Sequence, residues 1–254
     1  MGLIIQRING QLIDISNYNL RLVEFDPDSP EYKTRYEEVE GADGAVDLGT
    51  TIGVRKLKAR FKLNGNDMYH IVSLRNEIFK LFHSKEAFYI IDQRESEKRW
   101  LVKVDPYTIS TLRYIKTELE LHFVSSSPCA ESFYSTQELN SDGYTFQNSL
   151  FTIFNAGDES VDPRSKPLLI TFKGASDKLK IKNKTTGDEW AYNGKTTADD
   201  IIRLDRVRST KNSLSIVRDT NKKAIQLNAG VNEFEITGAT GAFSISFDFR
   251  FYYF

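Results

Sequence analysis

A strict alternation of apolar and cationic side chains runs through residues 56–63. Apolar residues take every second position and a lysine or arginine takes each position between, with Leu57, Ala59, Phe61 and Leu63 set against Lys56, Lys58, Arg60 and Lys62. Successive side chains of a β-strand point to opposite sides of the sheet. The pattern therefore predicts a strand with one face on a core and a cationic face outside.

The same period of two recurs along the first half of the chain. It predicts strands at 3–8, 11–15, 19–25, 32–39, 87–92, 99–105 and 113–123. Asn9-Gly10 separates the first two strands and is a strong hairpin signal. Only residues 66–83 repeat their apolar positions at three and four, which predicts an amphipathic helix capped by Asn66 or Asp67.

The second half of the chain keeps a β pattern with shorter strands. Turn sequences recur about every ten residues, which is typical of a β-sandwich. Strands are expected at 150–155, 167–174, 178–183, 189–194, 201–207, 213–219, 223–228, 232–237 and 242–254. The small, polar run from Ser125 to Ala130 contains a proline and indicates a domain boundary. We therefore expect a mainly β protein with an N-terminal sandwich or barrel-like domain over 1–132, containing the helix 66–83, and a C-terminal sandwich over 133–254.

Composition restricts the classes of partner. The 254 residues are 40% hydrophobic and 27% charged, with a net charge of −1. Neither half is a basic arm, so bulk charge does not favour nucleic acid or a membrane surface. No apolar run reaches the roughly 20 residues of a membrane helix, and the first residues do not resemble a signal peptide. The single cysteine, Cys129, suits a chain folded in a reducing cytoplasm.

No catalytic or metal-binding constellation emerges from the spacing of reactive residues. The three histidines are not paired at metal-ligand spacing, and neither H-E-x-x-H nor G-x-S-x-G occurs. Asp199-Asp200 could form a glycosidase carboxylate pair, but aspartates beside strands more often cap turns. We expect no catalytic residue, no cofactor and no metal, and a protein that is not an enzyme.

The cationic strand follows a glycine-rich stretch, residues 39–53, which we interpret as a turn cluster. A phosphate-binding loop is disfavoured because these glycines lead into a strand rather than a helix. The cationic row could follow a phosphate backbone, but a solvated or subunit-facing strand fits a neutral chain better. The candidate subunit-contact residues are Asp43, Asp47, Arg55, Lys56, Lys58 and Arg60.

Two aromatic residues of the second half are candidates for sugar binding. Trp190 and Tyr192 lie two positions apart and could stack on a glycan, although half-buried packing is the commoner role of such residues. A carbohydrate-binding module is therefore the alternative to a structural protein.

The order of features over residues 38–132 resembles the distal tail protein (Dit) family of siphophages that infect Gram-positive bacteria. The stretch EGADGAVDLGTTIGVRKLKARFKL is similar to that family's glycine segment and basic-aliphatic strand, and a helix at Asp67–His83 follows it. FHSKEAFYIIDQRESEKRWLVKV resembles the next pair of strands, with Asp92 before a charged tip. LELHFVSSSPCAES resembles the closing strand and its exit. The chain departs from the family at Glu40-Gly41-Ala42, where many relatives have a Pro-Gly-Arg-like sequence.

The resemblance implies a structural virion protein of the tail tip, assembled in the host cytoplasm. It implies a homohexameric ring that joins the tail tube protein to the tail-tip hub protein, with a receptor-binding protein as a further partner. Nucleic acid would only pass through the lumen of the ring, and no membrane is involved. The C-terminal half would be a galectin-like β-sandwich. Residues 39–53 and 54–63 would then make the subunit contacts.

Overall fold

The computed structural model describes residues 2–41, 43–109 and 116–254. The chain divides into an N-terminal unit, Met1–Ala130, and a C-terminal unit, Glu131–Phe254. The boundary expected from the sequence followed residue 132. Both units are mainly β, as the sequence predicts.

The N-terminal unit is built on an antiparallel sheet with the strand order β2-β1-β7-β8-β9-β6-β3. Its strands are β1 (Leu3–Gln6), β2 (Leu12–Asp14), β3 (Leu20–Pro27), β6 (Arg55–Asn64), β7 (Phe88–Asp92), β8 (Lys98–Val104) and β9 (Lys116–Ser125). The hairpin predicted at Asn9-Gly10 joins β1 to β2, and Gly10 has a φ of 88°. The part of the expected strand 113–123 that precedes Lys116 lies outside the described residues.

The core of this unit lies between the sheet and one helix. The four apolar residues of β6 are fully buried, which confirms the alternation read from the sequence. Helix α1 (Met68–Phe82) contributes Ile71, Leu74 and Ile78 to the same cluster. The Asp67 side chain accepts a hydrogen bond from the amide of His70 and caps the helix, as predicted. At its other end Phe82 packs against Phe123 of β9, with ring centroids 5.9 Å apart.

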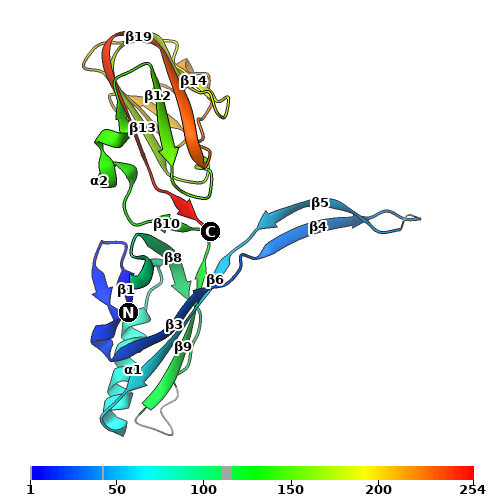
Figure 1. The fold of residues 1–254 in the computed structure, drawn as a ribbon, viewed down its shortest axis with the longest axis vertical. Helices are drawn as coiled ribbons and strands as arrows, with labels where there is room; N and C mark the ends of the chain where they lie inside the picture. Colours follow the sequence, from blue (N-terminus) through cyan, green and yellow to red (C-terminus); the bar gives the residue numbers. More distant parts are fainter. Residues whose placement is uncertain (1, 42, 110–115) are drawn as a thin grey trace. The chain divides into compact units, whose positions relative to one another are not determined.

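Between β3 and β6 the chain leaves the sheet as a separate two-stranded ribbon (Figure 1). It consists of β4 (Tyr32–Glu38) and β5 (Ala45–Ile52). The interpretation of residues 39–53 as a turn cluster was therefore wrong for β5, and only the stretch before it forms the turn. Gly49 lies inside β5 and does not interrupt the strand, because it occupies a bulge with a φ of 102°.

Two long strands make the C-terminal unit a sandwich: β13 (Leu168–Asn183) and β19 (Gly230–Phe249). Each joins two strands that the sequence analysis separated. They pair with each other over both halves, with register shifts between Gly174 and Lys180. Shorter strands pair along them, namely β11 (Thr145–Phe146), β12 (Leu150–Asn155), β14 (Glu189–Ala191), β15 (Lys195–Thr196), β16 (Ile201–Asp205), β17 (Arg208–Lys211) and β18 (Leu214–Ser215).

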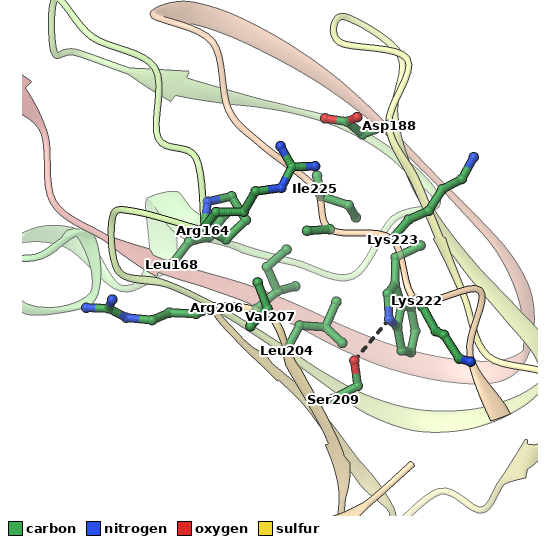
Figure 2. Close-up of a pocket in the computed structure, with 14 residues that line it drawn as sticks. Arg164, Leu168, Asp188, Leu204, Arg206, Val207, Ser209, Lys222, Lys223 and Ile225 are labelled. Atoms are coloured by element: carbon green, nitrogen blue, oxygen red, sulfur yellow. Dashed lines mark hydrogen bonds between the residues drawn. The ribbon is translucent and has the colours of Figure 1, made fainter. Parts of the chain in front are cut away.

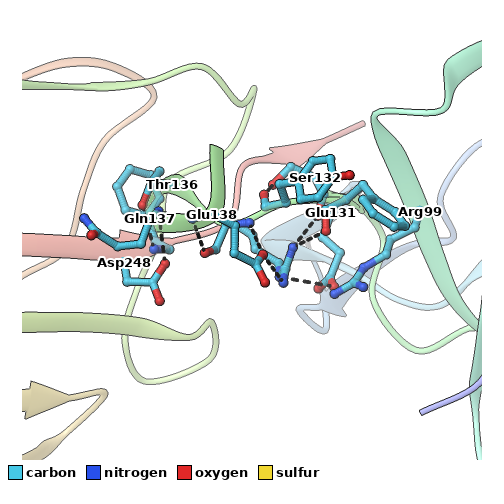
Figure 3. Close-up of polar contacts among 12 residues, drawn as sticks. Arg99, Glu131, Ser132, Thr136, Gln137, Glu138 and Asp248 are labelled. Atoms are coloured by element: carbon cyan, nitrogen blue, oxygen red, sulfur yellow. Dashed lines mark hydrogen bonds and ion pairs between the residues drawn. The ribbon is translucent and has the colours of Figure 1, made fainter. Parts of the chain in front are cut away.

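A short helix, α2 (Thr136–Asn140), closes one end of the sandwich and was not predicted. Ser135 and Glu138 form a reciprocal capping box at its start. The Thr136 hydroxyl donates to the carbonyl of Phe247 at 2.9 Å and accepts from the amide of Phe249 at 3.1 Å (Figure 3). The helix is thus fixed to the C-terminal end of β19. Two very short strands, β10 (Ala130–Ser132) and β20 (Tyr252–Tyr253), also pair with each other.

No helix within the described residues is long and apolar enough to cross a membrane.

Candidate subunit-contact surface

The ribbon of β4 and β5 has no core of its own. Every residue of β5 is exposed, and in β4 only Thr34 is partly covered. Several of the exposed side chains are large and apolar: Tyr32 (62% exposed), Tyr36 (66%), Val46 (51%), Leu48 (57%) and Ile52 (42%). An isolated two-stranded ribbon is at best marginally stable in water. The ribbon is therefore a surface on which a partner could bury apolar area.

The register places these residues on both faces of the ribbon. Tyr32 pairs with Ile52 and Thr34 with Thr50, whose hydroxyls lie 2.8 Å apart, so these four side chains share one face. Tyr36 follows by strand alternation on that face. Glu37 pairs with Val46 on the opposite face. Either face of the ribbon thus carries apolar residues.

The structure places the two aspartates predicted as contact residues on this ribbon. Asp43 is exposed at the turn between the strands. Asp47 lies in β5, where its Oδ1 accepts a hydrogen bond of 2.7 Å from the amide of Gly49. Asp47 therefore shapes the bulge of its own strand, whereas Asp43 is displayed at the tip.

Arg55 fixes the base of the ribbon rather than pointing freely to solvent. Its Nε donates to the carbonyl of Asp28 at 2.7 Å and its Nη1 donates to the carbonyl of Pro128 at 3.2 Å. The guanidinium also lies over the ring of Trp100, 5.2 Å from its centroid. These contacts hold the start of β6 to neighbouring segments, so Arg55 positions the ribbon instead of extending its surface.

The remaining cations lie on the outer face of β6, where β9 flanks them on one side and the edge strand β3 on the other. Lys58 pairs with Glu120 of β9 at 3.0 Å, and Arg60 pairs with Glu24 of β3. The Lys58 ammonium and then His122 hydrogen-bond to Glu120 and lower the pKa of its carboxylate. Lys56 is exposed on the same side. Two cations of the row, Lys58 and Arg60, are therefore compensated by carboxylates on the neighbouring strands, which the sequence of one strand could not reveal.

Trp190 and Tyr192 are only 1% and 6% exposed. The indole N–H of Trp190 donates to the hydroxyl of Ser209 at 3.1 Å inside the C-terminal unit. The expectation of a glycan-stacking platform is corrected by this burial, because a sugar needs an exposed ring face. Both rings instead belong to the sandwich core.

The aspartate pair considered as glycosidase carboxylates serves a turn. Asp200 accepts hydrogen bonds from the amide of Thr197 at 2.8 Å and the side-chain amide of Asn212 at 2.6 Å. The Thr197 amide and the Asn212 side chain lower the pKa of Asp200 to about 2. Asp199 is exposed beside it. Within the described ranges, no three His, Cys, Asp or Glu side chains gather as a metal ion would require.

Comparison with protein families gives a match in the N-terminal unit. Residues 8–125 match the family model described as the phage tail protein RIFT-related domain. The match lies within the N-terminal unit. No curated protein sequence matches the chain.

Solved structures extend the similarity to the whole chain. The Dit protein (gp 19.1) of phage SPP1, described as a paradigm of the hub adsorption apparatus in phages infecting Gram-positive bacteria, superposes with a TM-score of 0.74 at 13% identity, covering 99% of this chain and 100% of that one. A chain of the phage p2 baseplate in its activated conformation with Sr gives a TM-score of 0.48 at 8% identity, covering 98% and 97%. The family match and the SPP1 Dit fold confirm the resemblance inferred from the sequence.

Proposed function

We propose that this chain, whose residues 8–125 carry a phage tail protein RIFT-related domain, is a structural protein of the phage tail tip that assembles into a closed ring. The ring, of six copies by the family resemblance, joins the tail tube protein to the tail-tip hub protein. A receptor-binding protein is the further partner. The role is mechanical, so no catalytic residue is assigned.

The observation that carries this proposal is the uncovered ribbon. Its strands expose aromatic and aliphatic side chains on both faces and bury nothing within their own unit. Burial of apolar surface contributes about 25 cal/mol per Å², so a partner that covers Tyr36 and Leu48 would be favoured. A second copy of the chain is always available at the site of assembly.

The geometry of such a contact favours a ring. In the proposed ring the ribbon of one copy packs on a different surface of the next copy, so the two contacting surfaces are not the same patch. Head-to-tail contacts of this kind close into rings when the rotation per subunit divides a full turn. The cyclic form of the assembly is what the family resemblance implies, and the exposed ribbon supplies a surface for the contact.

The test is the solution mass of the full chain by light scattering over a concentration series. The wild type should be a hexamer, or should become one as concentration rises. Replacing Tyr36 and Leu48 by serine should lower the mass toward that of a monomer, whereas Leu12→Ser, which alters an equally exposed residue of β2, should not.

A wild type that stays monomeric at every concentration would contradict self-assembly of the isolated chain. If the variant with serine at Tyr36 and Leu48 assembles to the same mass as the wild type, the ribbon does not make the subunit contact. Circular dichroism of each variant separates lost assembly from lost folding, because the ribbon residues contribute nothing to the core of their own unit.

Stacking of a glycan on Trp190 and Tyr192 has no support in the structure. The carbohydrate-binding alternative rested on these two residues, and neither ring presents a face to solvent.

A further inference from the structure

The C-terminal unit contains a cavity of about 380 Å³ that the tail-tip role does not use. We call it the C-terminal pocket. It is formed by segments far apart in the sequence: the loop at Pro163-Arg164, the start of β13, strand β14, the turn between β16 and β17, and residues 222–225. Its volume is in the range of small-molecule sites in proteins.

The floor of the pocket is apolar and its rim is cationic. Leu168, Leu204, Val207 and Ile225 are among the residues that line it, and Figure 2 shows Leu204 and Val207 near its centre. Val207 is 62% exposed and is the accessible one of these four side chains, whereas Leu168, Leu204 and Ile225 lie beneath at 2–7%. Four cationic residues lie around them: Arg164, Arg206, Lys222 and Lys223. This composition suits a ligand that has both a C–H surface and a negative charge.

The positive charge of the rim is not compensated by the protein. Among the described residues, none forms an ion pair with the side chains of Arg206, Lys222 or Lys223, and Arg164 reaches only Asp162, at 3.5 Å. Asp188 is the acidic residue of the described lining. Its carboxylate already accepts hydrogen bonds from the Thr186 hydroxyl at 2.9 Å and the Gln226 amide at 3.1 Å. The charged ends of Arg206, Lys222 and Lys223 thus have no ionic partner in the described residues, and Figure 2 shows them spread around the opening.

Two of these cations occupy backbone positions that disfavour their side chains. Arg206 has a φ of 54° and Lys222 a φ of 57°. Arg206 begins the two-residue turn between β16 and β17, where a positive φ normally selects glycine. Side chains with a Cβ are strained in this region, and such strain is concentrated at functional sites. The chain thus keeps two cations at the rim at a cost to its own stability.

We propose that the C-terminal pocket binds a phosphorylated saccharide or polyol, with the phosphate on the cationic rim and the carbon skeleton on the apolar floor. Guanidinium and ammonium groups are the side chains that bind phosphate oxygens most strongly. A neutral sugar would leave the rim charges unused. Single-stranded nucleic acid would need exposed aromatic rings for stacking, and Trp190, the aromatic residue of the described lining, is 1% exposed.

Calorimetric titration of the full chain at low salt tests the proposal. The probes are glucose 1-phosphate and glycerol phosphate, compared with glucose, glycerol, inorganic phosphate and a single-stranded oligonucleotide. At least one phosphorylated probe should bind about tenfold more tightly than either its neutral parent or inorganic phosphate. The stronger of the two probes distinguishes a saccharide source from a polyol source.

A matched set of variants locates the binding. Arg206→Gly combined with Lys222→Gly removes two charges and two strained backbones, so affinity should fall about tenfold or more while the thermal midpoint stays the same or rises. Lys178→Gly is the control, because Lys178 is an exposed lysine with a φ of 54° outside the pocket. It should leave affinity unchanged. Lys223→Gln removes a rim charge without touching the strained backbone and should also weaken binding.

The proposal is overturned by the absence of binding of either phosphorylated probe at roughly 10 mM, or by equal binding of inorganic phosphate. Tighter binding of the oligonucleotide would overturn it as well. Unchanged affinity in the rim variants, or an equal loss in the Lys178 control, would place the binding elsewhere. None of these results bears on ring assembly, which is measured separately by solution mass.

Discussion

Phe234 and Phe247 belong to the same strand, β19, yet their rings pack face to edge across the C-terminal core with centroids 4.9 Å apart. The two halves of β19 therefore face each other, and one strand contributes to both layers of the sandwich. Phe151 of β12 stacks on Phe234 at 5.5 Å and continues the aromatic core.

Phe247→Ala should be among the most destabilising substitutions in the C-terminal unit. Phe247 is fully buried and contacts rings from both layers, so its loss removes apolar burial and leaves a cavity. We expect a loss of about 3–5 kcal/mol in the free energy of unfolding, measured by urea denaturation. Phe154→Ala is the control because Phe154 is 56% exposed, and it should change the free energy by less than about 1 kcal/mol.

Gly238→Ala should destabilise the bend of β19. Gly238 has a φ of 84°, and a Cβ built on it would lie 2.5 Å from the carbonyl oxygen of Lys178 on β13. The substitution combines a left-handed backbone with a backbone clash and should cost more than about 1–2 kcal/mol in the free energy of unfolding. Gly241→Ala serves as the control, because a Cβ there meets open space. Equal thermal midpoints for the two variants would contradict this account of the bend.

The N-terminal core was predictable because its pattern is local. Helix α1 repeats its apolar residues at three and four, and β6 alternates them, so each element reveals its own buried face. The residues expected over 66–83 and 56–63 fall within or beside these elements. A buried face imposes its period on the sequence, and that period can be read without the tertiary fold.

The ribbon and the long strands were harder to predict for physical reasons. Strand β5 has no buried face, so nothing imposes alternation on it, and Asp47 and Gly49 instead indicated a turn. Strands β13 and β19 bend at Gly174 and Gly238. A glycine in the sequence is as compatible with a bend inside a strand as with the end of a strand, so each long strand was expected as two short ones.

Of the features that the sequence analysis missed, helix α2 had a local signal, whereas the burial of Trp190 and the C-terminal pocket needed tertiary information. Ser135 and Glu138 do form a capping-box pattern in the sequence, and this signal could have found α2. The burial of Trp190 depends on Ser209 and on strands distant in sequence. The C-terminal pocket likewise collects residues from separate segments, and no local motif links Arg164 to Lys222.

Asp200→Asn should make stability less dependent on acid pH. Hydrogen bonds from Thr197 and Asn212 lower the pKa of Asp200 from 3.8 to about 2 in the folded state. A lowered folded pKa stabilises the protein above the unfolded value, and this contribution is lost as pH falls from 3.8 to about 2. Urea unfolding at several pH values should show wild-type stability falling across that window and a flatter profile for the variant. Asp199→Asn should retain the wild-type profile because Asp199 is exposed.

Reversing Lys58 and Arg60 together to glutamate should weaken ring assembly without unfolding the monomer. Each cation is paired with a carboxylate on a neighbouring strand and is about 40% exposed, at 39% and 42%, so each lost pair should cost about 1 kcal/mol or less. Light scattering gives the oligomer mass, and circular dichroism with thermal unfolding checks the fold.

The control for the reversal exchanges a pair instead of breaking it. Lys58→Glu with Glu120→Lys can restore the ion pair between β6 and β9, so the stability of the monomer should recover toward the wild type. If assembly depends on the charge that β6 presents to a neighbouring subunit, the variant with the exchanged pair should still assemble poorly. If assembly recovers together with stability, the reversal acted through the fold of the sheet. If the double reversal has the same oligomer mass as the wild type, β6 takes no part in the subunit contact. The ribbon would then form that contact without β6.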